Sequence, residues 1–533
     1  MEEEDHISPS EQTPLIAPVH RRTISMPRGL CITVLMGLLV FIQATNMSMM
    51  TTAQSYIAAD LDAFAEASWF TSAYLIALSS ITPLAGRLAQ IFTARLYVLF
   101  SAVLLAIGLF ISAAASSLAV FLVGRAVAGC GSGGLMSTSI ILVLDLATKK
   151  RRGLCIGLIN TGMTTGVASG AVLAGALTPS LGWRFMFWMQ APVAMLLGPL
   201  LFFAIPKPPQ LRENPSQGQS LWYSLARVDY AGALTLTISV VLLLSSLASP
   251  EISLWPILGS AVSFIIFVYI EAQWTTEPVI PVGLLKTRSV LLTCLAGLGM
   301  MMARWAVLFF TPVYAMAVRG WSPASAGLIL VPTNAGFGLG GLLVGWLHIR
   351  KTGSYYISCI VLFLLFALAT LALSLLSTPD SPVALYFATT FFDGLFAGAL
   401  VNYTLSHVLH LTSVPMHYIV TSLMTMSRGF AGSFGSAVGG GFFARVLKAS
   451  LESGFASHGL APQPELVRKL LGSPATVTQL TGSERVIAAE SYEHAVRTLF
   501  LAGGALALAA AAAQAGTGWT PAETDDKNDN YED

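Results

Sequence analysis

Four charged residues lie inside long apolar stretches of this chain, where a charge is expensive to bury. They are Arg125, Arg304, Asp393 and Arg428. A charged side chain at the centre of a bilayer costs roughly 2.5 to 3.5 kcal/mol on insertion scales, and such residues usually face a partner or a water-filled cavity. We therefore take them as the leading candidates for a functional site. The alternative is that each forms only a structural ion pair or a contact with backbone carbonyls.

The apolar stretches around these charges are long enough to cross a bilayer, which takes about 20 mostly apolar residues. The chain is 55% hydrophobic and 10% charged, whereas soluble domains average about 25% charged residues. We predict an all-α membrane protein with fourteen transmembrane spans. The predicted spans lie at about 29–57, 69–86, 96–116, 118–146, 153–178, 183–205, 230–249, 254–272, 289–316, 323–347, 355–376, 382–408, 417–444 and 494–515.

Basic residues are concentrated in the short connections on one side of these spans, for example at 149–152 and 350–351. The short loops on the other side hold only Arg184 and Arg319. Cytosolic loops of membrane proteins carry an excess of Lys and Arg. We therefore predict that both termini are cytosolic, which requires an even number of spans.

The spacing of the spans predicts two six-helix bundles with two helices inserted between them. The connection around 206–229 is rich in proline and polar residues, as is typical of a linker. The predicted segments are a disordered cytosolic tail at 1–28, an N-terminal bundle at 29–205, the cytosolic linker at 206–229, the helix pair at 230–272, a C-terminal bundle at 273–515 with a long non-cytosolic loop at 445–493, and a cytosolic tail at 516–533. Within the long loop, Glu465 to Leu471 has a helical pattern.

Several motifs occur in an order that resembles the major facilitator superfamily. Gly86, Gln90 and Arg95 belong to a stretch similar to the family's loop motif between its second and third helices, with Gln90 in place of the usual acid. Arg125 lies in a stretch that resembles the fourth-helix motif with its buried arginine. Gly166, Gly170 and Gly175 resemble the glycine-rich antiporter motif, although Ala171 replaces the usual proline.

With the six-two-six layout, the chain most resembles the fourteen-span drug:proton antiporter family. The stretch from Thr421 to Gly429 is similar to that family's fungal vacuolar basic amino acid branch. The resemblance implies that the first and fourth helices of each bundle line a central cavity. Asn46, Arg125, Arg304 and Asp393 then lie one on each of these helices, with Asn46 near the place of the family's first-span carboxylate.

On this assignment Arg304 and Asp393 form a candidate pair across the cavity. Asp393 is the leading candidate for a proton carrier because it is the only carboxylate in the middle of a predicted span. The glycines of the fifth span give a helix face on which a neighbouring helix can approach closely. We interpret Gly166, Gly170 and Gly175 as part of a gating seam, with tight static packing as the alternative. Gln90 cannot form the ion pair that the family's acid provides.

No Gly-x-x-x-x-Gly-Lys-Ser/Thr motif is present, so nothing in the sequence supports ATP hydrolysis as an energy source. The expected partners are a small organic solute, protons and the lipid bilayer, with no cofactor, no metal and no enzyme activity. We expect a proton-coupled transporter that exports or sequesters a drug, toxin or secondary metabolite at the plasma membrane or the vacuolar membrane. A vacuolar basic amino acid transporter and a non-transporting membrane sensor are the alternatives.

The amino-terminal tail contains a pattern that resembles an acidic dileucine sorting signal, formed by Glu11, Leu15 and Ile16. It would bind a sorting adaptor.

Overall fold

The computed structural model describes residues 25–64, 66–146, 152–206, 229–249, 251–275, 286–345, 355–413, 416–458 and 463–518, which are helical with connecting turns and contain no strand. The sorting pattern at Glu11, Leu15 and Ile16 lies outside these described residues. Eleven helices in the described part are long and apolar enough to cross a membrane. The prediction of an all-α, multi-pass membrane protein is confirmed, while the count of fourteen spans stays a prediction.

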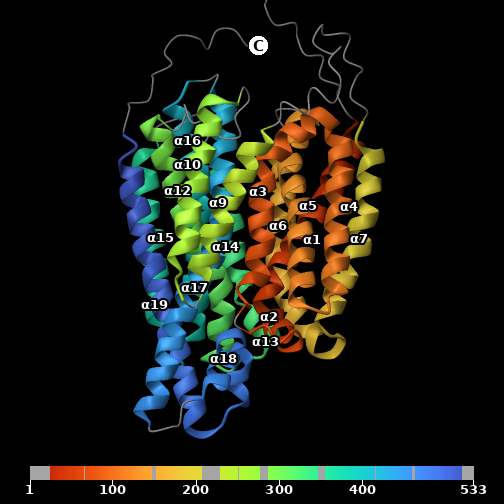
Figure 1. Ribbon diagram of the computed structural model, residues 1–533. Helices are drawn as coiled ribbons and strands as arrows, with labels where there is room; N and C mark the ends of the chain where they lie inside the picture. The colour runs from red at the N-terminus through yellow and green to blue at the C-terminus, as the bar shows by residue number, and fades with distance from the viewer. Residues whose placement is uncertain are drawn as a thin grey trace, which may run out of the picture.

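The first half of the chain forms one helical bundle, seen as the red to yellow helices of Figure 1. Its helices are α1 (Met26–Ser48), α2 (Met50–Asp60), α3 (Trp69–Phe92), α4 (Ala94–Ala113), α5 (Leu118–Leu146), α6 (Arg152–Leu181) and α7 (Trp183–Ala204). Within this N-half, α1 packs on α6, and α4 and α5 pack on each other. The expected first span is interrupted at Met49, where α1 ends and α2 begins.

The second bundle, the C-half, lies beside the first in Figure 1. Its elements are α12 (Arg288–Ala317), α13 (Pro323–Gly327), α14 (Leu330–Leu343), α15 (Tyr356–Leu376), α16 (Val383–His410), α17 (His417–Ser457), α18 (Pro464–Gly472), the 3-10 helix η4 (Pro474–Gln479) and α19 (Gly482–Ala515). The two halves meet where α6 packs on α13 and α14, and where α3 packs on α17.

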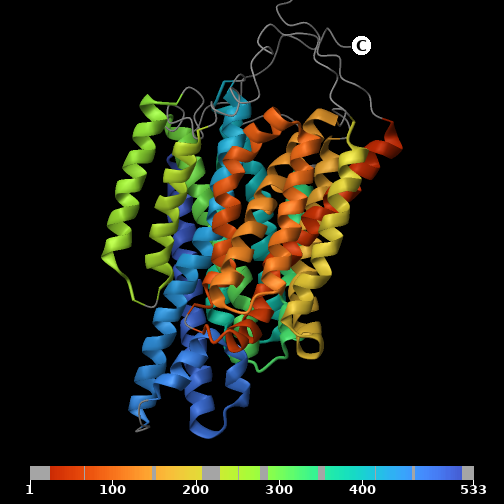
Figure 2. The same cartoon turned by 45° about the vertical axis from the view of Figure 1, so that its right-hand side comes forward.

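Between the halves in sequence come α9 (Tyr230–Ala248) and α10 (Leu254–Gln273), which stand as a hairpin on the outside of the molecule (Figure 2). Helix α9 contacts both α3 and α17. Arg445 of α17 donates to the backbone oxygens of Leu247 and Ser249, each at 2.9 Å. A cation at these terminal carbonyls is favourable because the end of a helix leaves them unpaired. Arg445 therefore anchors the hairpin to the C-half.

Helix α1 begins and α19 ends at the same end of the molecule, which we call the tail end (Figure 1). The opposite end, the cap end, holds α2, α13 and α18. This arrangement places the described ends of the chain on one side of the helical layer.

The expected long loop at 445–493 is largely helical instead. Helix α17 continues to Ser457 and α19 already begins at Gly482, while α18 and η4 lie between them. Side chains such as Leu451, Val467 and Ile487 pack into one buried cluster that joins these elements. The predicted helical pattern from Glu465 to Leu471 is confirmed by α18. These helices extend beyond the predicted spans because a helix that packs against other helices needs no continuous apolar run.

Candidate functional site

The N-half encloses a buried guanidinium at the junction of α1, α3 and α5. Arg125 is 0% exposed. Its Nε donates to the backbone oxygen of Phe70 at 2.8 Å, and Nη1 donates to Oδ1 of Asn46. The guanidinium also lies 4.6 Å from the centre of the Tyr74 ring, a favourable cation–π distance. Two of the predicted site residues, Asn46 and Arg125, are therefore in direct contact.

Three buried polar atoms of this N-half cluster have no hydrogen-bond partner among the described residues. They are Nη2 of Arg125, Nδ2 of Asn46 and Oε1 of Gln43. Leaving a buried donor or acceptor unpaired costs about 1–3 kcal/mol. The cluster can therefore take a water molecule or a polar group of a solute. Sequence reasoning missed Gln43, although it lies three residues before Asn46 on the same helix and so on the same face.

The C-half contains the second cluster, an ion pair between α12 and α16. Nη1 of Arg304 lies 4.0 Å from Oδ2 of Asp393, and the two side chains are 4% and 0% exposed. Arg304 also donates to Oγ1 of Thr333 at 3.2 Å and to Oδ1 of Asn334 at 3.4 Å, both on α14. Its guanidinium lies 4.4 Å from the centre of the Phe337 ring.

Asp393 keeps one carboxylate oxygen without a hydrogen bond. Oδ1 accepts from the hydroxyl of Thr370 on α15 at 3.0 Å, whereas Oδ2 has no hydrogen-bond partner among the described residues and faces Arg304. Protonation at Oδ2 would remove the charge that holds the guanidinium, while Thr333 and Asn334 would still accept from it. The arrangement therefore has a paired state and, with Asp393 neutral, a state in which Thr333 and Asn334 alone accept from Arg304.

The predicted pairing of Arg304 with Asp393 is present within the C-half, the bundle in which the sequence predicts both residues. Both residues belong to helices of the C-half and both are buried within it. Arg125 and Asn46 are buried in the same way within the N-half. Arg428, the remaining mid-span charge, lies on α17 at the seam where Ser79 of α3 donates to Gly429 at 3.1 Å. The structure therefore separates the predicted residues into two clusters.

A small cavity lies between the halves towards the cap end, with a volume of about 80 Å³. The lining residues are Thr51, Gln54, Ser55, Phe64, Ala67, Ser68, Thr71, Ala248, Phe309, Phe310, Val313, Ser436, Gly440, Phe443, Ala444, Leu471, Pro474 and Tyr492. Pockets for drug-sized ligands measure about 300–1,000 Å³, and one water occupies about 30 Å³ in the liquid. In this conformation the cavity has room for a few waters only, and neither charged cluster lines it.

The glycines of α6 make two different contacts. A Cβ on Gly166 would lie 2.5 Å from the backbone oxygen of Phe41, and one on Gly170 would lie 2.6 Å from that of Thr45, so this face packs on α1 inside the N-half. Gly175, in contrast, faces α13 of the C-half, where a Cβ would lie 2.4 Å from Pro323. The close approach predicted for these glycines is confirmed, and only Gly175 belongs to the seam between the halves.

The loop motif is only partly visible. Gly86 and Gln90 lie in the last turns of α3, and their side chains are outside the described part of the structure. Arg95 lies in the first turn of α4, and its guanidinium lies 3.9 Å from the centre of the Phe202 ring on α7. The missing ion pair expected from Gln90 stays a prediction.

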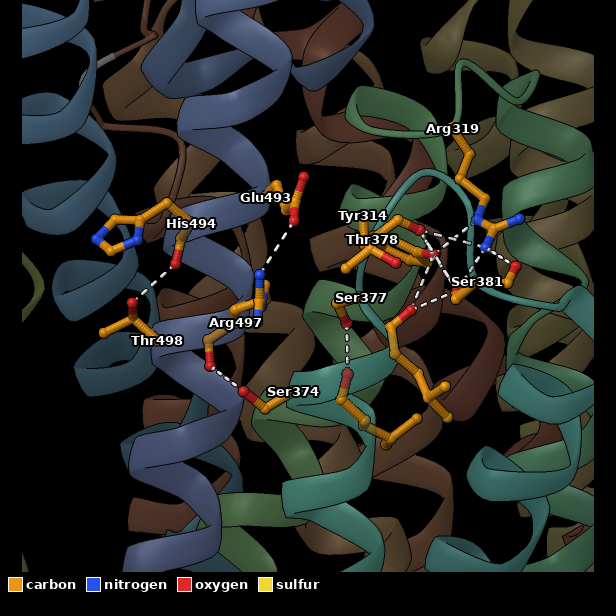
Figure 3. A network of polar contacts seen from close by, with 12 residues as sticks. Tyr314, Arg319, Ser374, Ser377, Thr378, Ser381, Glu493, His494, Arg497 and Thr498 are labelled. Atoms are coloured by element: carbon orange, nitrogen blue, oxygen red, sulfur yellow. Dashed lines mark hydrogen bonds and ion pairs between the residues drawn. The ribbon is translucent and has the colours of Figure 1, made fainter.

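At the cap end, Arg319 fastens α12 to the turn between α15 and α16 (Figure 3). It donates to the Tyr314 hydroxyl at 2.6 Å and to the Ser381 hydroxyl at 2.6 Å, and it also reaches the Ser381 backbone oxygen. The Tyr314 hydroxyl in turn donates to the backbone oxygen of Thr378 at 2.8 Å. These contacts make the cap end of the C-half one rigid unit.

Residues 36–436 match the family model of the Major Facilitator Superfamily, and the chain belongs to this family of membrane transporters. Solved structures agree in fold. The structure of a bacterial homologue of the human lysosomal transporter Spinster, in an inward-facing and occupied conformation, superposes with a TM-score of 0.61 at 13% identity over 93% of this chain and 100% of that one. A D-xylose–proton symporter gives a TM-score of 0.55 at 14% identity over 85% and 96%.

The curated relatives include fungal efflux pumps. The "MFS-type efflux pump LUC4" of a Fusarium species is 27% identical over 430 residues, which cover 78% of this chain and 74% of the relative. The "Efflux pump notK" of an Aspergillus species is 27% identical over 490 residues, covering 87% and 82%. The "Acurin A biosynthesis cluster MFS-type transporter" of Aspergillus aculeatus is 27% identical over 418 residues, covering 75% and 73%.

Proposed function

We propose that this transporter moves a small organic compound, such as a drug, toxin or secondary metabolite, out of the cytosol in exchange for protons. The observation that carries the proposal is the buried pair of Arg304 and Asp393, 4.0 Å apart within a major facilitator fold. The similarity to relatives named as efflux pumps supports the direction of transport. One elementary charge crossing 100 mV provides about 2.3 kcal/mol, which is enough to drive accumulation several tens-fold.

In this mechanism Asp393 carries the proton. When Asp393 is ionised it holds Arg304, and α12 and α16 are tied together. When it is protonated, the charge attraction is lost and Arg304 keeps only its bonds to Thr333 and Asn334 on α14. The relative position of α12 and α16 then responds to the proton gradient, and this response drives the exchange between inward and outward access.

The charge balance of the two clusters favours a neutral or anionic solute. They hold two guanidinium groups, of Arg125 and Arg304, and one carboxylate, of Asp393. A carrier for a cationic amino acid should offer more acid than base at its site. The unpaired donors of Arg125 and Asn46 suit a solute oxygen better than an ammonium group. We therefore place the vacuolar basic amino acid transporter second.

We propose that both ends of the chain are cytosolic, in the plasma membrane or the vacuolar membrane. The described chain begins and ends at the same end of the molecule (Figure 1), as an even number of crossings requires. The basic connections predicted to be cytosolic support the same orientation. On this proposal the tail end faces the cytosol and the cap end faces away from it.

The test first identifies the transported solute and then measures whether its transport is coupled to protons. Comparing compounds retained by intact cells and isolated vacuoles with and without the gene identifies a transported compound. The purified protein in liposomes should then accumulate that compound under an imposed pH gradient. Asp393→Asn should abolish this accumulation but leave exchange of labelled for unlabelled compound, which needs no net proton movement. The matched control is Asp380→Asn, an exposed carboxylate near the start of α16.

Accumulation by Asp393→Asn equal to that of the unaltered protein would remove Asp393 as the proton carrier. If the protein binds the compound but exchanges none of it across the liposome membrane in either direction, a membrane sensor that does not transport would be favoured instead.

A further inference from the structure

The connection between α17 and α19 carries a small helical unit, made of α18 and η4, which we call the cap. Leu471 of α18 and Pro474 of η4 line the cavity between the halves. On the other side of the cavity are N-half residues such as Thr51 and Phe64. The cap therefore forms part of the cavity wall at the cap end of the molecule.

The cap is built into the C-half. Val467, Leu470 and Val477 pack into the buried cluster that includes side chains of α17 and α19. The hydroxyl of Tyr492 on α19 donates to the backbone oxygen of Leu470. Gln463, just before α18, donates to Glu484 of α19 at 2.8 Å. These contacts fix the cap to the C-half as one body.

The cap contacts the N-half at α2 and at the corner between α2 and α3. Arg468 donates to the backbone oxygen of Asp62 at 3.0 Å and to its carboxylate at 3.1 Å. Gly472 packs so closely on Phe64 that an added Cβ would lie 2.5 Å from the Phe64 backbone oxygen. Buried packing thus holds the cap to the C-half, whereas an exposed ion pair and a close glycine contact are among its contacts with the N-half.

We infer that the cap is the outer gate of the transport path, and that its contact with the corner at Asp62 and Phe64 must break before a solute can leave at the cap end. The inference rests on the proposed function, because it needs the two halves to rock against each other. The cap is fixed to the C-half. When the two halves tilt apart, it therefore moves away from the N-half. The cavity below it then opens.

The contact chemistry fits a gate that opens repeatedly. Exposed ion pairs contribute little net stability because water and salt screen them, and Arg468 and Asp62 have side chains that are 39% and 76% exposed. Gly472 gives a close fit without a side chain that would have to leave a pocket. Neither contact would hold the halves together strongly.

The test measures how fast a reagent reaches the cavity. A reporter cysteine replaces Ser55, which lines the cavity, in a full-length chain whose five native cysteines are replaced by serine or alanine. The protein is placed in lipid nanodiscs and reacted with a water-soluble maleimide. Gly472→Ala should raise the labelling rate at least about fivefold, since the added Cβ forces the cap off Phe64. Arg468→Gln should raise it about 1.5- to 5-fold, the range expected for an exposed ion pair.

Two controls match these changes. Lys469→Gln removes a charge from the exposed face of the same helix, and Gly297→Ala adds a Cβ where no atom lies within 4 Å. Neither should change the labelling rate. If Gly472→Ala and Arg468→Gln both label at the unaltered rate, the cap is not a gate.

A crosslink tests the opposite direction. Phe64→Cys combined with Gly472→Cys brings two Cβ atoms to about 2.8 Å, so a small relaxation reaches the 3.5–4.5 Å that a disulfide needs. Oxidation should slow labelling of the Ser55→Cys reporter and stop solute release, and reduction should restore both. Continued release with the disulfide formed would overturn the inference. Labelling requires no proton gradient, so a failure of proton coupling at Asp393 would leave this result standing.

Discussion

Asp393→Asn removes the negative charge from a pair whose atoms are 4.0 Å apart and whose side chains are 4% and 0% exposed. Two unit charges at 4 Å attract by about 4 kcal/mol at the effective dielectric constant of 20 that describes most protein sites. Breaking a buried pair by removing one partner costs about 3–5 kcal/mol, since the other charge stays buried. We expect the free energy of unfolding to fall by about 3–5 kcal/mol in Asp393→Asn and in Arg304→Gln.

The double variant should be much less destabilised than the sum of the two single variants, by an amount of the order of 4 kcal/mol. The assay is unfolding by sodium dodecyl sulfate in mixed micelles, which measures the free energy of unfolding of each of the four proteins. The pair of Arg184 and Asp60 is the control. It is shorter, at 2.7 Å, but its side chains are 41% and 44% exposed, so its coupling should not exceed about 1 kcal/mol.

The reasoning is refuted if the coupling between Arg304 and Asp393 is no larger than that between Arg184 and Asp60. In that case burial does not strengthen the pair, and the charge switch assigned to Asp393 loses its energetic basis.

Three further changes test the remaining contacts. Gly170→Ala should lower the free energy of unfolding by about 1–3 kcal/mol, because the new Cβ would lie 2.2 Å from Oγ of Ser48. Gly29→Ala is the control and should leave the free energy of unfolding unchanged, because no atom lies within 4 Å of its added Cβ. Equal effects of the two changes would contradict the close packing of α6 on α1. Asn46→Asp should stabilise the N-half in the same unfolding assay and slow solute exchange in liposomes. The reason is that a carboxylate would bind Arg125 more tightly than the amide does. Faster solute exchange by this variant would contradict the expected tighter contact. Arg319→Gln should cost about 1–3 kcal/mol of unfolding free energy because the Ser381 backbone oxygen and the Tyr314 and Ser381 hydroxyls each lose a hydrogen bond from Arg319. An unchanged midpoint would show that these contacts do not stabilise the cap end.

Much of the candidate site could be predicted from the sequence because charges are rare inside apolar runs. Arg125, Arg304 and Asp393 stand out for that reason alone, and the expected pairing of the last two is present. Gln43 could not be recognised in the same way, since an uncharged amide in a helix gives no signal until its neighbours are known. Its importance depends on the buried side-chain oxygen that has no hydrogen-bond partner among the described residues.

The interval 445–493 shows where hydropathy fails. Apolar runs mark the part of a helix that can lie in a membrane, so they give no sign that α17 continues to Ser457 and that α19 already begins at Gly482. The turns of α17 and α19 beyond the predicted spans pack on each other and on α18 through Leu451, Val467 and Ile487. No local pattern reveals such contacts because they join segments that are distant along the chain.

By itself, the sequence determined that the chain is a helical membrane protein, which residues carry charge inside it and, through its motifs, the family to which it belongs. Transfer of apolar side chains out of water and the cost of burying charge are properties of single residues and short segments, so they can be read along the chain. Only the tertiary structure decided that the charges form two separate clusters, that Gly175 alone among the three motif glycines faces the other half, and that the cap rests on Asp62 and Phe64. These depend on which helices meet, and that is set by packing among residues hundreds of positions apart.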